Sequence, residues 1–123
     1  MGNEEYKSNY RPLIPNCNQI IYNKLESLEK ITEKTSAIII ETIQGASGFI
    51  EASQDFLNQL KKKCIKNNVL IIFDEIQTCF GRTGKLFGFQ HTEIVPDILC
   101  IAKGMGGGYP IGAVSYTHLT LPT

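Results

Sequence analysis

Apolar and polar residues alternate along the chain in blocks that predict secondary structure. Residues 37–43, 69–73 and 98–102 are short, almost wholly apolar runs rich in β-branched side chains. Such runs are typical of strands that are buried on both faces of a sheet. Between the first two runs, Ser53 is the expected N-cap of an amphipathic helix. The apolar face of this helix is formed by Phe56, Leu57, Leu60 and Cys64.

The first third of the chain carries weaker signals. Residues 1–16 are polar and interrupted by prolines, so they predict an irregular segment. Residues 19–22 predict a short strand. Asn23 is the expected N-cap of a helix that follows, with Glu26 completing a capping box. The apolar face of that helix is formed by Leu25, Leu28 and Ile31.

The order strand, helix, strand predicts the α/β class, with a right-handed βαβ unit in a parallel sheet. In sheets of this kind, ligands bind beyond the carboxyl ends of the strands. The residues expected at these ends are Glu41, Asp74 and Lys103. They are therefore the first candidates for a functional site.

Composition excludes several classes of function. The 123 residues are 42% apolar and 20% charged, which is typical of one globular domain. Twelve Lys and Arg balance twelve Asp and Glu, so no net charge favours nucleic acid or an anionic membrane. The apolar runs are far shorter than the roughly 20 residues of a membrane-spanning helix. Four scattered cysteines and two histidines predict no metal site, and a reduced, cytoplasmic chain is expected.

Asp74 and Lys103 each follow an apolar run and carry opposite charges. A structural ion pair is one interpretation, because such pairs far outnumber catalytic ones. The glycines at 104 and 106–108 favour another, since they let the backbone approach a ligand closely. A lysine partly desolvated beside such a loop can lose its proton and act as an amine nucleophile.

The segment LIIFDE, residues 70–75, also matches the strand and acidic pair that position magnesium and water in P-loop ATPases. That interpretation needs a G-x-x-x-x-G-K-[ST] loop. Neither GASG at 45–48 nor KGMGGG at 103–108 fits that pattern. An ATPase fragment that lacks its phosphate loop therefore remains a distant alternative.

Longer segments are more specific. IIIETIQGASGFI, IIFDEIQTCFGRTGKLFGFQ and VPDILCIAKGMGGGYPIGA, with MGNEEYK and YRPLIP near the start, strongly resemble class III aminotransferases. Within that family the chain is most similar to acetylornithine aminotransferases. The resemblance implies part of the large domain of a fold type I enzyme that uses pyridoxal 5'-phosphate (PLP). It extends over residues 1–113.

The resemblance also implies roles for individual residues. Lys103 corresponds to the lysine that holds PLP as a Schiff base. Asp74 corresponds to the aspartate that hydrogen-bonds the pyridine nitrogen. A carboxylate there keeps the ring protonated, so that it accepts electrons, while the freed lysine amine shuttles a proton. Gln77 corresponds to a glutamine that hydrogen-bonds the phenolic oxygen of PLP. Ile76 corresponds to a branched aliphatic residue that packs on one face of the ring.

Two further residues are expected to support this site rather than bind the cofactor. Glu41 matches a family glutamate near the site, and we expect a structural role for it. Arg82, between Gly81 and Gly84, is expected to shape a tight turn. Ala46 stands where the family usually has a glutamate that pairs with a substrate-binding arginine, so the substrate range is open.

The resemblance implies transfer of an amino group from an ω-amino donor such as acetylornithine to 2-oxoglutarate, in a homodimer. The chain corresponds to about a third of such an enzyme, and we expect it to be inactive alone. Residues 114–123 leave the family pattern and resemble a translated sequencing adapter, so His118 is not assigned a role. A truncated reading frame without function and a related aminomutase are the other hypotheses.

Overall fold

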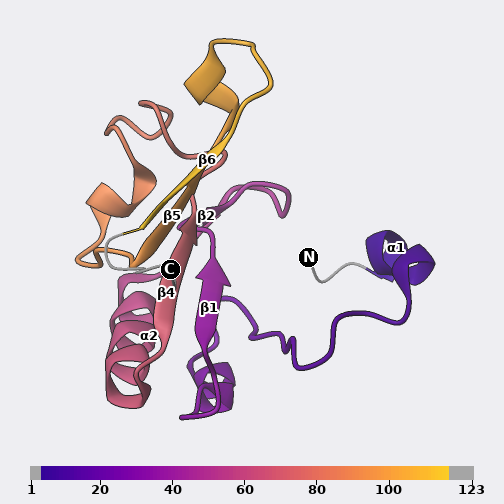
Figure 1. The fold of residues 1–123 in the computed structure, drawn as a ribbon. Helices are drawn as coiled ribbons and strands as arrows, with labels where there is room; N and C mark the ends of the chain where they lie inside the picture. The colour runs from indigo at the N-terminus through magenta and orange to yellow at the C-terminus, as the bar shows by residue number, and fades with distance from the viewer. Residues whose placement is uncertain (1–3, 117–123) are drawn as a thin grey trace, which may run out of the picture.

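The computed structural model describes residues 4–116. They form short helices, a four-stranded sheet, a small two-stranded sheet and one longer helix (Figure 1). The elements in chain order are α1 (Glu4–Lys7), η1 (Ser8–Tyr10), η2 (Leu25–Lys30), β1 (Ala37–Ile40), β2 (Ile43–Gln44), β3 (Ile50–Glu51), α2 (Gln54–Asn67), β4 (Leu70–Asp74), η3 (Gly88–His91), β5 (Ile98–Ile101), η4 (Lys103–Gly106) and β6 (Ala113–Tyr116).

The larger sheet has the strand order β1-β4-β5-β6. β4 pairs in parallel with β1 on one side and β5 on the other, while β6 pairs antiparallel with β5. β2 and β3 form a separate antiparallel pair. The expected α/β class is confirmed, and the antiparallel strand β6 makes the sheet mixed. The parallel neighbours β1 and β4 are joined through α2, whereas β4 and β5 are joined by irregular chain and η3.

The core lies between α2 and one face of the sheet. Ser53 caps α2 as expected, because its side chain accepts a hydrogen bond from the Phe56 backbone N–H at 3.2 Å. The helix ends at Asn68, whose left-handed conformation is common at this position. The side chains that α2 and the strands bury together include Phe56, Leu57, Leu60, Cys64, Ile38, Ile40, Ile71 and Phe73.

Burial of the strands on both faces, expected from their apolar sequence, is wrong for the described part of the chain. Ile38 and Ile40 are buried, but Ile39 between them is 61% exposed. In Figure 1, α2 covers one face of the sheet. The expected run at 37–43 is also divided, since β1 ends at Ile40 and β2 begins at Ile43.

The structure also corrects the expected helix cap at Asn23. Residues 19–22 are not a strand, and the helix that follows is the 3₁₀ element η2, without a side-chain cap. Asn23 instead adopts a φ of 60° and reaches forward in the sequence. Its amide donates to the Glu51 carbonyl and accepts from the Ser53 backbone N–H, both at 2.8 Å. Asn23 thus links the lead-in to the start of α2.

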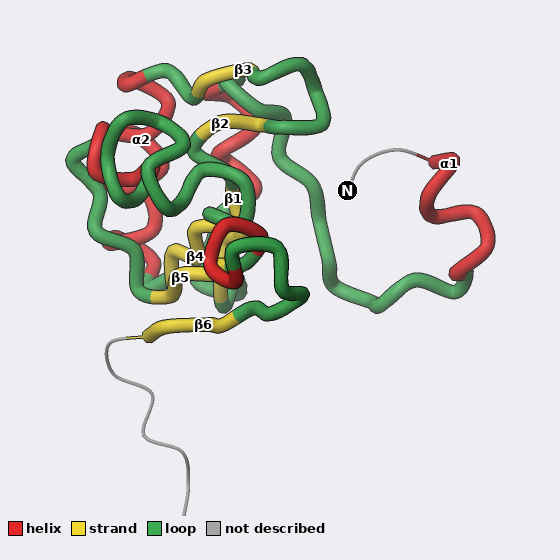
Figure 2. Tube along the Cα trace, turned by 90° about the horizontal axis from the view of Figure 1, so that it is seen from above, coloured by secondary structure: helices red, strands yellow, loops and turns green. Residues whose placement is uncertain are grey.

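The two ends of the described chain lie on opposite sides of the fold. α1 and the irregular segment after it extend away from the sheet (Figures 1 and 2). β6 includes residues 114–116 of the expected adapter-like tail, whereas residues 117–123, with His118, lie outside the described residues. None of the helices within 4–116 has the length and apolar character needed to cross a membrane.

Candidate active site

The carboxyl ends of the three parallel strands meet at one edge of the sheet. The register pairs Ile40 with Phe73, and Asp74 with Cys100. Glu41 and Asp74 each stand one residue past the Ile40–Phe73 pair, and Lys103 follows three residues after Cys100. The topology therefore brings the three candidates chosen from the sequence to the same edge.

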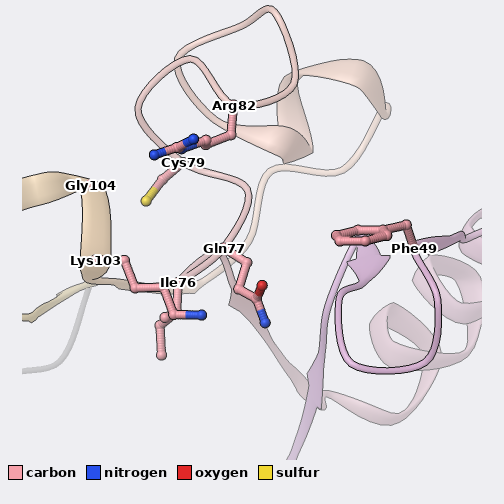
Figure 3. Close-up of a pocket in the computed structure, with 7 residues that line it drawn as sticks. All are labelled: Phe49, Ile76, Gln77, Cys79, Arg82, Lys103 and Gly104. Atoms are coloured by element: carbon pink, nitrogen blue, oxygen red, sulfur yellow. The ribbon is translucent and has the colours of Figure 1, made fainter.

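A cavity of about 260 Å³ opens at this edge (Figure 3). Three elements contribute to it: the loop between β2 and β3, the irregular chain after β4, and the start of η4. In the view of Figure 3, Gln77 lies between Lys103 and Phe49, with Arg82 and Cys79 to one side. The lining residues are Phe49, Ile76, Gln77, Cys79, Arg82, Lys103 and Gly104. Two are cationic and none is acidic.

Backbone strain gathers around this cavity. Among the described residues, six non-glycine residues have positive φ, and three of them are asparagines, which tolerate it. The other three are Phe49 (59°), Phe80 (56°) and Lys103 (47°). Phe49 and Lys103 line the cavity, and the Phe80 ring lies against Gly104, which also lines it. Strain of this kind persists where surrounding structure imposes it, and it is concentrated at functional sites.

The side chain of Lys103 is not buried. We expected it to be partly desolvated, but its side chain is exposed in the structure. Figure 3 shows the side chain extending from η4 toward Gln77. A strained backbone and a shared cavity, rather than desolvation, distinguish Lys103 from the other lysines.

Asp74 lies next to the cavity but does not line it. Its Oδ1 accepts a hydrogen bond from the Ile76 backbone N–H at 3.1 Å, which fixes the turn after β4. Within residues 4–116, its Oδ2 accepts no hydrogen bond. The pKa of the neighbouring Cys100 thiol is raised by burial and by the Asp74 charge. Asp74 therefore presents one committed and one available carboxylate oxygen.

Glu41 acts on the loop that faces Gln77. Its Oε2 accepts a hydrogen bond from the Gly45 backbone N–H at 3.0 Å. Gly45 lies against the Gln77 side chain so closely that a Cβ added there would be 2.6 Å from Nε2. Glu41 thus holds in place the backbone that limits where the Gln77 amide can lie.

Sequence reasoning did not assign a role to Glu75, which the structure buries directly before the cavity-lining residues Ile76 and Gln77. Its side chain is fully buried. The carboxylate accepts hydrogen bonds from the Gly88 N–H at 2.7 Å, the Phe89 N–H at 2.6 Å and the Thr78 hydroxyl. The acidic pair in LIIFDE was visible, but nothing in the sequence indicated which donors would surround Glu75.

Arg82 is held at the tip of a closed loop, as its flanking glycines indicated. Gly81 and Gly84 have positive φ, and the Gly81 N–H bonds the Leu86 carbonyl at 3.4 Å. The loop also carries the Arg82 side chain to the cavity, which the sequence did not suggest.

In the part of the chain that the structure describes, no group of His, Cys, Asp or Glu could hold a metal ion.

Comparisons with known proteins agree on one family. The family model described as Aminotransferase class-III matches residues 3–120. The chain is 46% identical over 114 residues to acetylornithine aminotransferase from Clostridium acetobutylicum, covering 92% of this chain and 30% of that protein. It is 46% identical over 112 residues to the [LysW]-aminoadipate semialdehyde/glutamate semialdehyde transaminase of Sulfolobus acidocaldarius, covering 91% and 29%.

Solved structures are similar in fold as well as sequence. Ornithine aminotransferase from Toxoplasma gondii, in a structure with partial occupancy of PLP at its active site, gives a TM-score of 0.84 at 34% identity. The match covers 92% of this chain and 27% of that one. N-acetylornithine aminotransferase from Stenotrophomonas maltophilia gives 0.74 at 37% identity, covering 79% and 27%. The chain spans less than a third of the length of these relatives.

Proposed function

The chain belongs to the class-III aminotransferase family, and on this premise we propose that it is part of the PLP-binding large domain of an aminotransferase. Enzymes of this family depend on PLP. The proposed reaction transfers an amino group from an ω-amino donor of the acetylornithine type to a 2-oxo acid, with 2-oxoglutarate as the expected acceptor. Residues 1–113 carry this part of the domain.

The groups that line the cavity, together with Asp74 next to it, match the chemistry of the cofactor. PLP offers an aldehyde, a phenolic oxygen and a ring nitrogen, and it supplies an electron-accepting ring when bound. The described chain offers the Lys103 amine, the Gln77 amide, and the Asp74 Oδ2, which accepts no bond within residues 4–116. An amine, an amide donor and a carboxylate are the complementary groups for those three positions.

Each residue has a defined task in this proposal. Lys103 Nζ is the covalent attachment point and, once released, carries a proton to and from the reacting carbon. Asp74 Oδ2 accepts the ring N–H and keeps that nitrogen protonated. The Gln77 amide donates to the phenolic oxygen, and Ile76 packs against the ring face. Glu41 supports Gln77 through Gly45, as its hydrogen bond to the Gly45 N–H suggests.

The strained backbone at Lys103 is the observation that carries the proposal. A φ of 47° is unfavourable for a residue that carries a side chain. Lys103 adopts it although the next residue, Gly104, has no side chain and would tolerate this conformation better. A lysine with this backbone conformation in the lining of a cavity supports a functional role for its amine. The resemblance of this segment to the family's cofactor lysine supports the same assignment.

The ATPase alternative conflicts with the surroundings of Glu75. In P-loop ATPases, the acidic pair after the strand positions magnesium and water, so both carboxylates must be accessible. Here the Glu75 side chain is fully buried and accepts three hydrogen bonds. A carboxylate with those partners has no free face for a metal-bound water.

The assembly and setting of the enzyme are part of the proposal. We infer a homodimer for the full-length enzyme from its family, and a chain inactive by itself because it spans less than a third of its relatives. The four cysteines are unpaired, which is consistent with the reducing cytoplasm.

A chimeric enzyme tests the proposed function. In the C. acetobutylicum relative, the 114 aligned residues are replaced by the corresponding part of this chain. We expect the chimera to transfer the amino group of acetylornithine to 2-oxoglutarate, and its Lys103→Ala variant to be inactive. Activity that survives Lys103→Ala contradicts the assignment. A folded chimera that binds PLP without catalysing transfer contradicts the proposed reaction.

A further inference from the structure

We propose that Glu75 is a positioning residue, whose carboxylate holds the chain carrying Gln77 and Arg82 in the geometry of the cavity. This inference rests on the proposed function, because it assigns Glu75 to the same site. Glu75 does not line the cavity, so any effect on it passes through other residues.

The carboxylate joins two segments that are distant along the sequence. Oε2 accepts from the Thr78 hydroxyl, three residues ahead, and from the Gly88 N–H at 2.7 Å. Oε1 accepts from the Phe89 N–H at 2.6 Å. The Glu75 side chain therefore binds both ends of the loop between Glu75 and residues 88–89. The residues between them include Gln77, Cys79 and Arg82, which line the cavity.

The main chain of Glu75 adds further attachments. Its N–H donates to the Cys100 carbonyl at 2.9 Å, which ties the end of β4 to β5. Its carbonyl accepts from the Thr78 and Cys79 N–H groups at 3.2 and 3.0 Å. Glu75 is therefore anchored to the sheet on one side and to the cavity loop on the other.

The packing around the carboxylate leaves little freedom. A Cβ added to Gly88 would lie 3.0 Å from Glu75 Oε2 and 2.7 Å from Thr42 Oγ1. Glycine at 88 allows the N–H to approach Oε2 directly. Because a buried carboxylate with three donors resists displacement, it sets the position of the loop more firmly than neutral hydrogen bonds would.

Asp97 provides a matched control. Its Oδ2 accepts a hydrogen bond from the Ile71 N–H at 2.7 Å, so it also binds a backbone donor of β4. It lies at the amino end of that strand, away from the cavity. Glu75→Gln and Asp97→Asn therefore each remove one carboxylate next to β4, at opposite ends.

The experiment compares the two variants in the 123-residue chain. Three quantities are measured: the free energy of unfolding in urea, the side-chain amide resonances of Gln77, and the rate at which PLP and borohydride label Lys103 relative to Lys62, an exposed lysine on α2. We expect both variants to be less stable. Only Glu75→Gln should shift the Gln77 resonances. It should also reduce the preference for labelling Lys103 over Lys62 roughly tenfold, because misplaced binding groups slow the reaction.

The outcomes separate this inference from the proposed function. Wild-type Gln77 resonances and wild-type preference in Glu75→Gln overturn it, as do equal changes in Asp97→Asn. If the wild-type chain shows no preference for Lys103, the proposed function fails, and the Gln77 resonances alone decide the role of Glu75. If Glu75→Gln does not fold, Thr78→Val replaces it. That variant should shift the Gln77 resonances, while Thr78→Ser, which keeps the hydroxyl, should not.

Discussion

Gly45 lies against the Gln77 amide so closely that a Cβ on Gly45 would be 2.6 Å from Nε2 and 2.9 Å from Oε1. The contact joins the loop between β2 and β3 to the chain after β4. Since the Glu41 carboxylate bonds the Gly45 N–H, the position of Gln77 depends on a residue at the end of another strand. A small change at Gly45 can therefore alter the proposed site without altering the core.

Gly45→Ala tests this contact. The exposed end of Gln77 can move aside, so we expect the free energy of unfolding to change by less than about 0.5 kcal/mol. The Gln77 side-chain resonances should shift, and labelling of Lys103 by PLP should slow. Gly48→Ala is the control, because Gly48 has a φ of 93° and nothing within 4 Å of an added Cβ. It should cost about 1 kcal/mol and leave Gln77 unchanged. The reverse pattern contradicts the proposed contact.

Lys103→Gly and Lys103→Ala separate strain from chemistry. Both remove the amine and should abolish labelling at this position. With a φ of 47°, glycine relieves a backbone cost that alanine retains, so Lys103→Gly should be more stable by about 1 kcal/mol. Urea unfolding of the two variants measures the difference. Equal stabilities would show that the backbone at Lys103 is not strained.

Thr42 carries a buried hydroxyl without a hydrogen-bond partner among the described residues. Thr42 is 5% exposed, so its hydroxyl lies away from bulk solvent. We expect Thr42→Val, which exchanges the hydroxyl for a methyl group of similar size, to raise the free energy of unfolding by about 1 kcal/mol. Thr42→Ser keeps the hydroxyl and should give no gain. A destabilised Thr42→Val would mean that the hydroxyl has a partner.

Cys64 makes the stability of the fold depend on alkaline pH. Burial, with a smaller contribution from the Asp97 charge, raises the pKa of its thiol from about 9 to about 11. Below pH 9 the thiol is protonated in both states and its contribution to stability is complete. Between pH 9 and 11 the unfolded state releases the proton first, so the free energy of unfolding falls.

Unfolding in urea at pH 8 and pH 10 measures this effect. We expect the wild-type chain to lose about 1 kcal/mol more than Cys64→Ala between these two values. Tyr22 also has a raised pKa, through burial and the charges of Glu41 and Glu51, and its effect is common to both proteins. The same pH dependence in both proteins contradicts the role of Cys64.

The strands β4 and β5 and the helix α2 could be predicted because their signals are local, whereas β6 was not predicted. Apolar runs of strand length gave β4 and β5 to within one residue, and the Ser53 cap with one apolar face gave α2. Asn23 could not be placed in this way. An asparagine with a glutamate three residues later fits a capping box, but its amide binds the backbone at 51 and 53, which is a tertiary contact.

The candidate site was predictable in its strand ends and not in its loops. Glu41, Asp74 and Lys103 follow from the positions of the strands, because parallel strands end at the same edge. The approach of Gln77 to Gly45, and of Glu75 to residues 88–89, depends on how irregular chain closes over that edge. The exposure of Ile39 could not be predicted either. The local sequence of a strand does not show whether another element covers each of its faces.

Selective labelling is the sharpest test of Lys103 as the lysine that binds PLP. The 123-residue chain is incubated with PLP, reduced with borohydride and digested, and the modified lysines are identified by mass spectrometry. We expect Lys103 to be modified first, ahead of exposed lysines such as Lys62, and Asp74→Asn to reduce this preference. Modification spread evenly over the lysines, or directed mainly to another one, would contradict it.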